Sequence, residues 1–489
     1  MGIIARQSFF NSISIAIAYL IGAFNTVFLY PNYMGSKLQG LVVALLSISN
    51  LVQPFISFGV QHALIKFYSS SESKEERDKL LSLSVFLPIL IFVLLLMIAL
   101  FFHESITDFI ASENEEIGKY SYLILAIAFA TALFEVFYNW LRVQLASVFG
   151  NFLKELFPRA LIFVLLLLFA FEMLDLDGFV MALIAGYYLR LLLIVAYSFA
   201  KYTPKFSLTL PDQFKSILRY SLLIFMSGTA ASLILDIDKS MISNFLTVEN
   251  VAYYSVAIFI AAVIELPGRA MFQIVSPLVA KAINENDEKS LKNLLKKSAN
   301  NLLLISGLLF LLINLNLNDF YVWADLEDYT IALDVVLIVS FGKLFTMSMG
   351  CLNNIITNSK YYPYVFWFST TSAFLAVLLN LYLIQSYGIV GAAYATLAVI
   401  VLINILKLVL VQVKFKINPY GRETFITLGI VFLLYVFVSQ LTMNIAPFWS
   451  LLVRSFIIGL GFAVLSHLLK LTEDIRQFVL KALSKLKRA

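Results

Sequence analysis

Two opposite charges lie four residues apart inside an apolar stretch of the chain. The stretch 251–280 is long enough to cross a bilayer, yet it contains Glu265 and Arg269, with Pro267 between them. An isolated charge at the bilayer centre costs about 3 kcal/mol, so such residues face one another, a water-filled cavity or a ligand. Because proline removes a helix hydrogen bond, it tends to kink the helix. The pattern favours a helix that lines a polar path; an i,i+4 pair along the helix is the alternative.

Bases outnumber acids among the charges that lie deep in apolar stretches. The four bases and two acids are Arg159, Arg190, Arg269 and Lys343, with Glu135 and Glu265. Two acids cannot neutralise four bases, and arginine binds phosphate through paired hydrogen bonds. We predict that the four bases contact an anion in a cavity. The alternative is a structural ion pair or triad among Glu135, Arg159 and Arg190, which would lock three consecutive helices together.

Other polar residues complete the candidate set. Asp236, with Asp238, lies at the end of an apolar stretch, where the pair would bind a coupling cation or form an interfacial cap. Asn353 and Asn354, like Asn300 and Asn301, could hydrogen-bond a sugar. Three bases near the ends of stretches are predicted to reach the headgroups: Lys119, Lys407 and Arg454. The predicted cavity or coupling residues are Glu135, Glu265, Gln53, His62 and Asp236.

The composition is that of an integral membrane protein. Of 489 residues, 61% are hydrophobic and 13% charged, whereas a soluble chain is nearer a quarter charged. One cysteine and three scattered histidines predict no metal site, and no cofactor is expected. The net charge of +5 does not indicate binding to nucleic acid, because the basic residues are concentrated in alternate connections between the apolar stretches. Phosphate-loop, metalloprotease and nucleophile-elbow motifs are absent from the sequence, so we predict a protein that is not an enzyme and has no catalytic residues.

Apolar stretches about 20 residues long recur along the whole chain, as spanning helices require. We predict fourteen, at about 7–30, 38–62, 80–102, 119–141, 149–171, 178–200, 214–236, 251–275, 299–317, 329–350, 362–385, 388–412, 424–445 and 448–469. Alternate connections hold nineteen Lys or Arg, and the others only Lys37 and Lys239. Since basic loops favour the cytoplasm, both termini are predicted to be cytoplasmic.

A weak internal repeat divides the predicted helices. The second stretch, with Pro54, matches the eighth, with Pro267, and each is followed by a charged segment, 71–81 or 286–297. These charged segments predict short amphipathic helices. We therefore predict an all-α polytopic fold of two six-helix lobes in pseudo-twofold repeat plus two extra C-terminal helices. The predicted domains are 1–205, 206–415, 416–470 and a basic amphipathic cytoplasmic tail, 471–489.

Three segments resemble those of a known transporter family. They are 2–67, 236–270 (DIDKSMISNFLTVENVAYYSVAIFIAAVIELPGRA) and 379–405 (LNLYLIQSYGIVGAAYATLAVIVLINI). The chain resembles bacterial polysaccharide-biosynthesis, O-antigen-type flippases of the multidrug/oligosaccharidyl-lipid/polysaccharide exporter superfamily. The resemblance implies a pair of six-helix lobes around a cationic cavity, in the bacterial cytoplasmic (inner) membrane. It also implies flipping of undecaprenyl-pyrophosphate-linked oligosaccharide by alternating access.

One departure separates this chain from a related branch. Peptidoglycan-precursor flippases place several arginines on the first two helices, where this sequence offers Gln53, His62 and Lys66. The expected partners are lipid-linked oligosaccharide, membrane lipids and other polysaccharide-assembly proteins. The competing readings are a cation-coupled multidrug or metabolite antiporter of the same superfamily, with Glu265 as coupling acid and Na⁺ or H⁺ as coupling ion, and a scaffold that binds a partner through its tail.

Overall fold

The prediction of an all-α membrane protein is confirmed. The computed structural model describes residues 15, 17–68, 71, 73–110, 113–144, 146–443 and 445–471, and the side chains of these except residues 147, 227–235 and 273. Within these ranges the chain forms helices and connecting segments and contains no strand. The predicted amphipathic tail, at 472–489, lies outside the described residues.

Ten helices in the described part of the chain are long and apolar enough to span a membrane. They are Ile17–Ser57, Lys74–Phe101, Ser121–Val143, Leu176–Lys201, Val248–Phe272, Glu288–Trp323, Glu327–Ser348, Pro363–Phe415, Arg422–Ser439 and Pro447–Leu468. Two of them contain a glycine with positive φ, Gly35 (71°) and Gly388 (59°), where the sequence predicts a boundary between two spans. Glycine adopts this left-handed conformation without a steric penalty. The total of fourteen spans stays a prediction.

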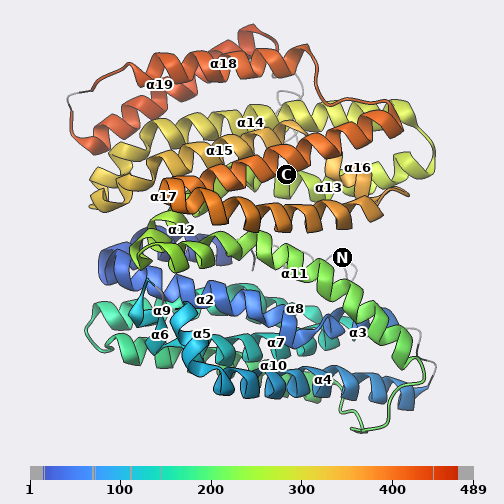
Figure 1. Cartoon of the computed structure of the whole chain (residues 1–489). Helices are drawn as coiled ribbons and strands as arrows, with labels where there is room; N and C mark the ends of the chain where they lie inside the picture. Colours follow the sequence, from blue (N-terminus) through green and yellow to red (C-terminus); the bar gives the residue numbers. More distant parts are fainter. Residues whose placement is uncertain are drawn as a thin grey trace, which may run out of the picture. The chain divides into compact units, whose positions relative to one another are not determined.

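The chain folds as two compact units (Figure 1). Unit 1 comprises Met1–Val256 and Ala376–Gly388, and unit 2 comprises Ala257–Leu375 and Ile389–Ala489. The predicted domain boundaries and the repeat remain predictions. From residue 25 to 245 the helices are η1 (Asn25–Met34), α2 (Gly35–Ser57), α3 (Val60–Tyr68), α4 (Lys74–Phe101), α5 (His103–Ile110), α6 (Glu115–Lys119), α7 (Ser121–Val143), α8 (Ser147–Asn151), η2 (Phe152–Leu156), α9 (Phe157–Ala170), α10 (Leu176–Lys201) and α11 (Phe214–Phe245).

The remaining helices follow from residue 248. They are α12 (Val248–Ala262), η3 (Val263–Glu265), α13 (Leu266–Asn284), α14 (Glu288–Trp323), η4 (Glu327–Ala332), α15 (Leu333–Ser348), α16 (Leu352–Thr357), α17 (Pro363–Phe415), α18 (Arg422–Ser439) and α19 (Pro447–Leu468). Of the short segments, η1 and η2 are π-helices, and η3 and η4 are 3-10 helices.

The two charged segments differ from the short separate helices that their sequence predicts. Each forms the first turns of a long apolar helix, α4 or α14. Ser73 caps α4 by accepting a hydrogen bond from the backbone of Glu76, and Asp287 caps α14 in the same way for Ser290. Hydrogen bonds from the side chain and backbone of Ser290 lower the pKa of the Asp287 carboxyl group. The prediction that both segments are helical is therefore confirmed, but no break separates them from the following apolar helix.

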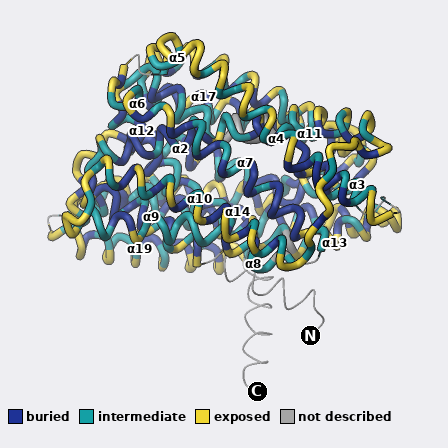
Figure 2. Tube along the Cα trace, turned by 90° about the horizontal axis from the view of Figure 1, so that it is seen from below, coloured by how far each residue is buried: buried dark blue, intermediate teal, exposed yellow. Residues whose placement is uncertain are grey.

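The core of unit 1 surrounds α7. This helix packs against α2, α3 and α10, and Figure 2 shows much of its length as buried. Phe134 and Trp140 are among its fully buried side chains. Small residues at the contacts between helices of unit 1 let the backbones approach closely, as is usual for helices that pack in membranes.

A glycine marks one such close approach within unit 1. A Cβ at Gly40 would lie 1.8 Å from the carbonyl oxygen of Val248. We expect Gly40→Ala to lower the free energy of unfolding by about 1–3 kcal/mol, because the backbone of Val248 must move. Gly459→Ala, where nothing lies within 4 Å, is the matched control. Thermal unfolding of the two purified variants tests this, and equal stability would contradict the close packing.

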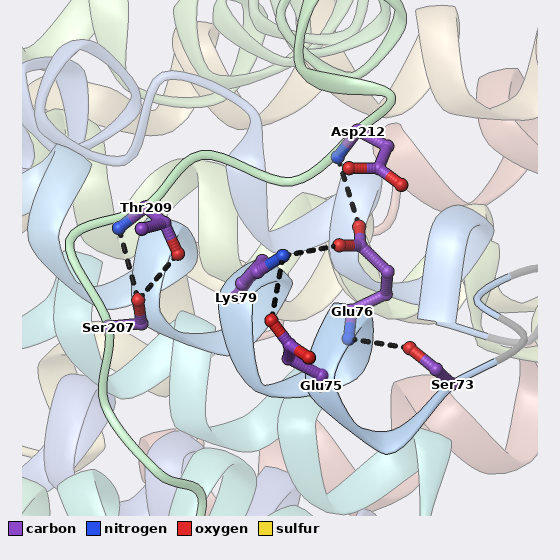
Figure 3. Close-up of polar contacts among 7 residues, drawn as sticks. All are labelled: Ser73, Glu75, Glu76, Lys79, Ser207, Thr209 and Asp212. Carbon is purple, nitrogen blue, oxygen red and sulfur yellow. Dashed lines mark hydrogen bonds and ion pairs between the residues drawn. The ribbon is translucent and has the colours of Figure 1, made fainter.

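The connector 202–213 is fastened to the start of α4. Asp78 accepts hydrogen bonds from the Tyr202 hydroxyl and the Lys205 backbone. Glu76 accepts one from the backbone of Asp212 at 3.0 Å, as Figure 3 shows. These bonds hold the connector that leads into α11 along unit 1.

Unit 2 is built on α14, which packs against α13, α15, α18 and α19. One buried ion pair joins α14 to α19. Arg454 lies 2.7 Å from Asp319 and also donates to the Leu315 carbonyl at 2.8 Å. Ser450 donates to the same carboxylate. The guanidinium of Arg454 thus pairs with an acid on the neighbouring helix, and its reach to the headgroups stays a prediction.

Candidate functional site

The helix that carries Glu265 and Arg269 is broken at Pro267, as the sequence predicts. The α-helix α12 ends at Ala262, the 3-10 segment η3 follows, and Pro267 opens α13. The hydroxyl of Ser306 donates a hydrogen bond of 2.9 Å to the carbonyl of Ile264 in this break. A 3-10 stretch inside a helix often marks a functional hinge. The break also sets the direction of the side chains on either side of it.

Glu265 pairs with Lys343 rather than with Arg269. The Lys343 ammonium lies 3.0 Å from the Glu265 carboxylate, and both side chains are about four-fifths buried, with 21% exposed. The i,i+4 alternative is therefore wrong for this pair. Lys343 lies on α15, so the pair joins two helices of unit 2 that are distant in sequence.

A polar cavity of about 290 Å³ lies beside this ion pair within unit 2. It is lined by residues from η3, α13, α15, α16, α17 and the turn before α16: Glu265, Arg269, Phe272, Thr346, Met347, Met349, Gly350, Leu352, Asn353, Asn404 and Lys407. The amide of Asn404 donates to the hydroxyl of Thr346 at 2.9 Å. Neutral hydrogen-bonding groups thus lie in the same cavity as the charges.

Two cations in this cavity have no carboxylate partner. Across the described part of the chain, neither Arg269 nor Lys407 forms an ion pair. Because Glu265 is already paired with Lys343, the cavity carries an excess of positive charge. An unpaired charge at membrane depth is costly unless it meets water or a counter-ion. The arrangement is therefore suited to an anion.

The sequence assigned Lys407 a different role. It was predicted to reach the headgroups, but it lines the cavity beside Arg269. Lys407 and Asn404 are three residues apart, so they lie on one helix face, and Thr346 is three residues from Lys343. That spacing of polar residues in apolar helices is a signal that could have identified them.

In unit 1 the alternative triad of Glu135, Arg159 and Arg190 does not form. Glu135 pairs with Lys154 at 2.7 Å, and Arg159 pairs with Glu155 at 3.2 Å. Both bases that make these contacts are more than a third exposed, so the pairs are only partly desolvated. A Glu135–Arg159–Arg190 triad is therefore wrong, because Glu135 pairs with Lys154 and Arg159 pairs with Glu155 instead.

Arg190 is held by aromatic rings. Only 5% of the residue is exposed, and its guanidinium lies 3.9 Å from the ring centre of Phe134 and 5.1 Å from that of Tyr187. Its Nε is buried without a hydrogen-bond partner among the described residues. A cation over aromatic faces gains about 2 kcal/mol when desolvated. Its role as an anion contact stays a prediction.

The remaining predicted cavity or coupling residues, Gln53, His62 and Asp236, belong to unit 1 and are not among the residues that line the cavity of unit 2. Gln53 donates to the Ser57 hydroxyl at 3.2 Å, and His62 is exposed on α3. Asp236 pairs with Lys239 at 2.8 Å. Asp238 accepts hydrogen bonds from the Tyr254 hydroxyl and the Asn380 amide, both 2.6 Å long.

Comparison with known proteins identifies the family. The family described as polysaccharide biosynthesis protein matches residues 4–267. The chain belongs to this family. No curated protein matches it in sequence. The family that its sequence motifs resemble is thus confirmed.

Solved structures share the fold of this chain. A lipid II flippase, MurJ, in an inward closed conformation is 19% identical, with a TM-score of 0.73 over 95% of this chain and 99% of that one. An inward-facing multidrug resistance MATE transporter of the MOP superfamily is 15% identical, with a TM-score of 0.62 over 82% and 94%. At these identities the likeness establishes the fold, which is one that transporters use.

Proposed function

We propose that this protein flips undecaprenyl-pyrophosphate-linked oligosaccharide from the inner to the outer leaflet by alternating access. The observation that carries the proposal is the pair of unneutralised cations, Arg269 and Lys407, in a cavity between spanning helices. A diphosphate supplies the anion that these cations lack. Membership of the polysaccharide biosynthesis family supports a glycan as the cargo.

The lining assigns a part of the substrate to each group. Arg269 suits the diphosphate, because its planar guanidinium binds two oxygens at once, and Lys407 adds a point charge. Thr346, Asn353 and Asn404 offer hydrogen bonds to sugar hydroxyls. A cavity of about 290 Å³ is at the lower end of small-molecule sites, so it holds the diphosphate and the nearest sugar rather than a whole oligosaccharide.

The hinge provides the movement. The 3-10 break and Pro267 lie directly before Arg269 in the chain. A small backbone change there re-aims Arg269 without melting the rest of α13. Hinges in conformational changes are typically a few residues that absorb the backbone change, and this break has that form.

Both termini of this multi-pass membrane protein lie in the cytoplasm under this proposal, and the membrane is the bacterial inner membrane. Other polysaccharide-assembly proteins hand over the cargo. The lack of arginines on the first two helices, which offer Gln53, His62 and Lys66 instead, favours a surface-polysaccharide unit over a peptidoglycan precursor as the cargo.

Deleting the gene should cause lipid-linked oligosaccharide to accumulate in the inner leaflet. Unchanged surface polysaccharide without such accumulation would reject the proposal.

The alternative is a cation-coupled antiporter, and Glu265 in the cavity is the observation that favours it. Na⁺ or H⁺ is the coupling ion that we propose for either function. Asp238 is a second candidate to bind it, because Asn380 and Tyr254 place two further oxygen-bearing side chains around its carboxylate. Asp236 is less suited, since Lys239 already neutralises it.

Glu265→Gln separates the two functions. We expect this variant to lower export by no more than about fivefold, because the glutamine oxygen still accepts a hydrogen bond from Lys343 and so leaves the ammonium partnered; a loss of about 1 kcal/mol corresponds to about fivefold. An antiporter that couples through Glu265 would lose its ion-gradient-driven efflux of small organic cations entirely. Export in cells and efflux in everted vesicles are measured on the same variant. Lost efflux with normal surface polysaccharide would favour the antiporter.

A further inference from the structure

A second and larger cavity lies within unit 1. Its volume is about 820 Å³, and eleven of its fifteen lining residues are apolar. The other four are three serines and one asparagine, so none of the described residues that line it is charged. The proposed transport cycle, as described above, makes no use of this cavity.

The cavity is a groove between spanning helices. Its walls come from α2, the end of α4, the end of α11 and the Ala376–Gly388 part of α17, and the short helix α5 covers one side. Figure 2 shows α5 as an exposed helix, and none of its residues is buried. Phe109 is 70% exposed, and Phe102 and Leu381 are also exposed. The groove is therefore open to the surrounding membrane.

The charges around the groove decide what enters it. Two acids of α5, Glu104 and Asp108, are next in sequence to residues that line the groove. Two acids of α11, Asp236 and Asp238, flank the lining residue Ile237. Lys239 is the nearest base on α11, and Asp236 neutralises it at 2.8 Å. His103, which can also carry a positive charge, is the first residue of α5, and its ring contacts the hydroxyl of Thr107. A phosphate group at the mouth would face mostly negative charge, so the groove is suited to a hydrocarbon chain alone.

We propose that this groove binds the polyprenyl tail of the carrier lipid. The inference rests on the proposed flippase function. A phospholipid carries its phosphate directly beside its acyl chains, whereas a polyprenyl chain is long enough for its far end to lie away from its diphosphate. Burying apolar surface at about 25 cal/mol per Å² makes such a groove a binding site for the chain. The groove lies at the membrane end that the loop charges predict to face outward, so it holds the tail in the outer leaflet.

A photoaffinity experiment tests the groove directly. The probe is a polyprenyl monophosphate with a diazirine at the far end of its chain, added to the full-length protein in lipid nanodiscs. We expect labelling of the peptides that contain 102–110 and 237–245, and competition by unlabelled polyprenyl phosphate but not by added phosphatidylglycerol. Even labelling of all lipid-facing helices, or equal competition by the phospholipid, would overturn the proposal.

A matched pair of variants sharpens the test. Met241 is buried and lines the groove, so Met241→Trp should fill it and abolish labelling of both peptides. Leu100→Trp, at a residue that is 70% exposed and not part of the lining, should leave labelling unchanged. Persistent labelling in folded Met241→Trp would overturn the site. If both peptides are labelled but the protein supports no export of surface polysaccharide, the flippase function is rejected and the groove remains a binding site for the polyprenyl chain.

Discussion

Arg269→Ala is expected to reduce export of surface polysaccharide at least about tenfold while the protein still inserts and folds. Arg269 is exposed in the cavity and forms no ion pair in the described part of the chain, so its removal leaves no acid unpaired. A hydrogen bond to a charged group contributes about 1.5–3 kcal/mol, which corresponds to about tenfold or more in binding. Export per cell, normalised to the amount of membrane-inserted protein, is the measurement.

The same helix supplies the control. Lys281 lies on α13, is 70% exposed and contacts Glu285 at 3.8 Å. Lys281→Ala should therefore export normally, although it removes one positive charge from the same helix. Lys407→Ala should resemble Arg269→Ala. Normal export from both cavity variants would remove the basis for assigning the diphosphate to this site.

Arg454→Met is expected to lower the free energy of unfolding by about 3 kcal/mol, the largest effect on stability that we predict. The Arg454 side chain is 14% exposed and its partner Asp319 is 20% exposed. Removing one member of a buried pair leaves the other charge without compensation, which costs about 3–5 kcal/mol. Thermal unfolding of the purified protein would show the loss as a lower melting temperature than that of the wild-type protein.

A double variant distinguishes this cause from lost packing. In Arg454→Met with Asp319→Leu, no charge is left unpaired, so most of the stability should return. Arg422→Met is the control, because Arg422 is exposed and forms no ion pair within the described residues. If the double variant were as unstable as the sum of the single variants, the ion pair would not explain the loss.

The fold was predictable from the sequence because its signals are local. Hydropathy predicts spanning helices and the approximate boundaries between them, and Pro267 predicts the kink in one of them. These features depend on residues within one or two turns, so they need no knowledge of the packing. The charged segments that open α4 and α14 predict separate short helices, because the polarity of the sequence changes where each segment meets an apolar stretch. The helical backbone nevertheless continues through that change.

The partners of the charges were not predictable in the same way. Glu265 pairs with Lys343, 78 positions further along the chain, and Arg454 pairs with Asp319 across 135. Such pairs depend on how each helix is rotated about its axis, which apolar sequences specify weakly. Lys407 illustrates the limit: its place near the end of an apolar stretch suggested the headgroups, but the rotation of α17 directs it into a cavity.

Transport by the purified protein tests the central claim most directly. A fluorescent polyprenyl-diphosphate-linked oligosaccharide is placed in both leaflets of vesicles that contain the protein, and a membrane-impermeant enzyme that modifies the glycan reports on the outer leaflet. We predict that the wild-type protein renders nearly all of the lipid accessible and that Arg269→Ala leaves the inner half protected. The account would be contradicted if the inner-leaflet lipid were as protected from the enzyme with wild-type protein as in protein-free vesicles. This comparison is made both with and without an imposed ion gradient.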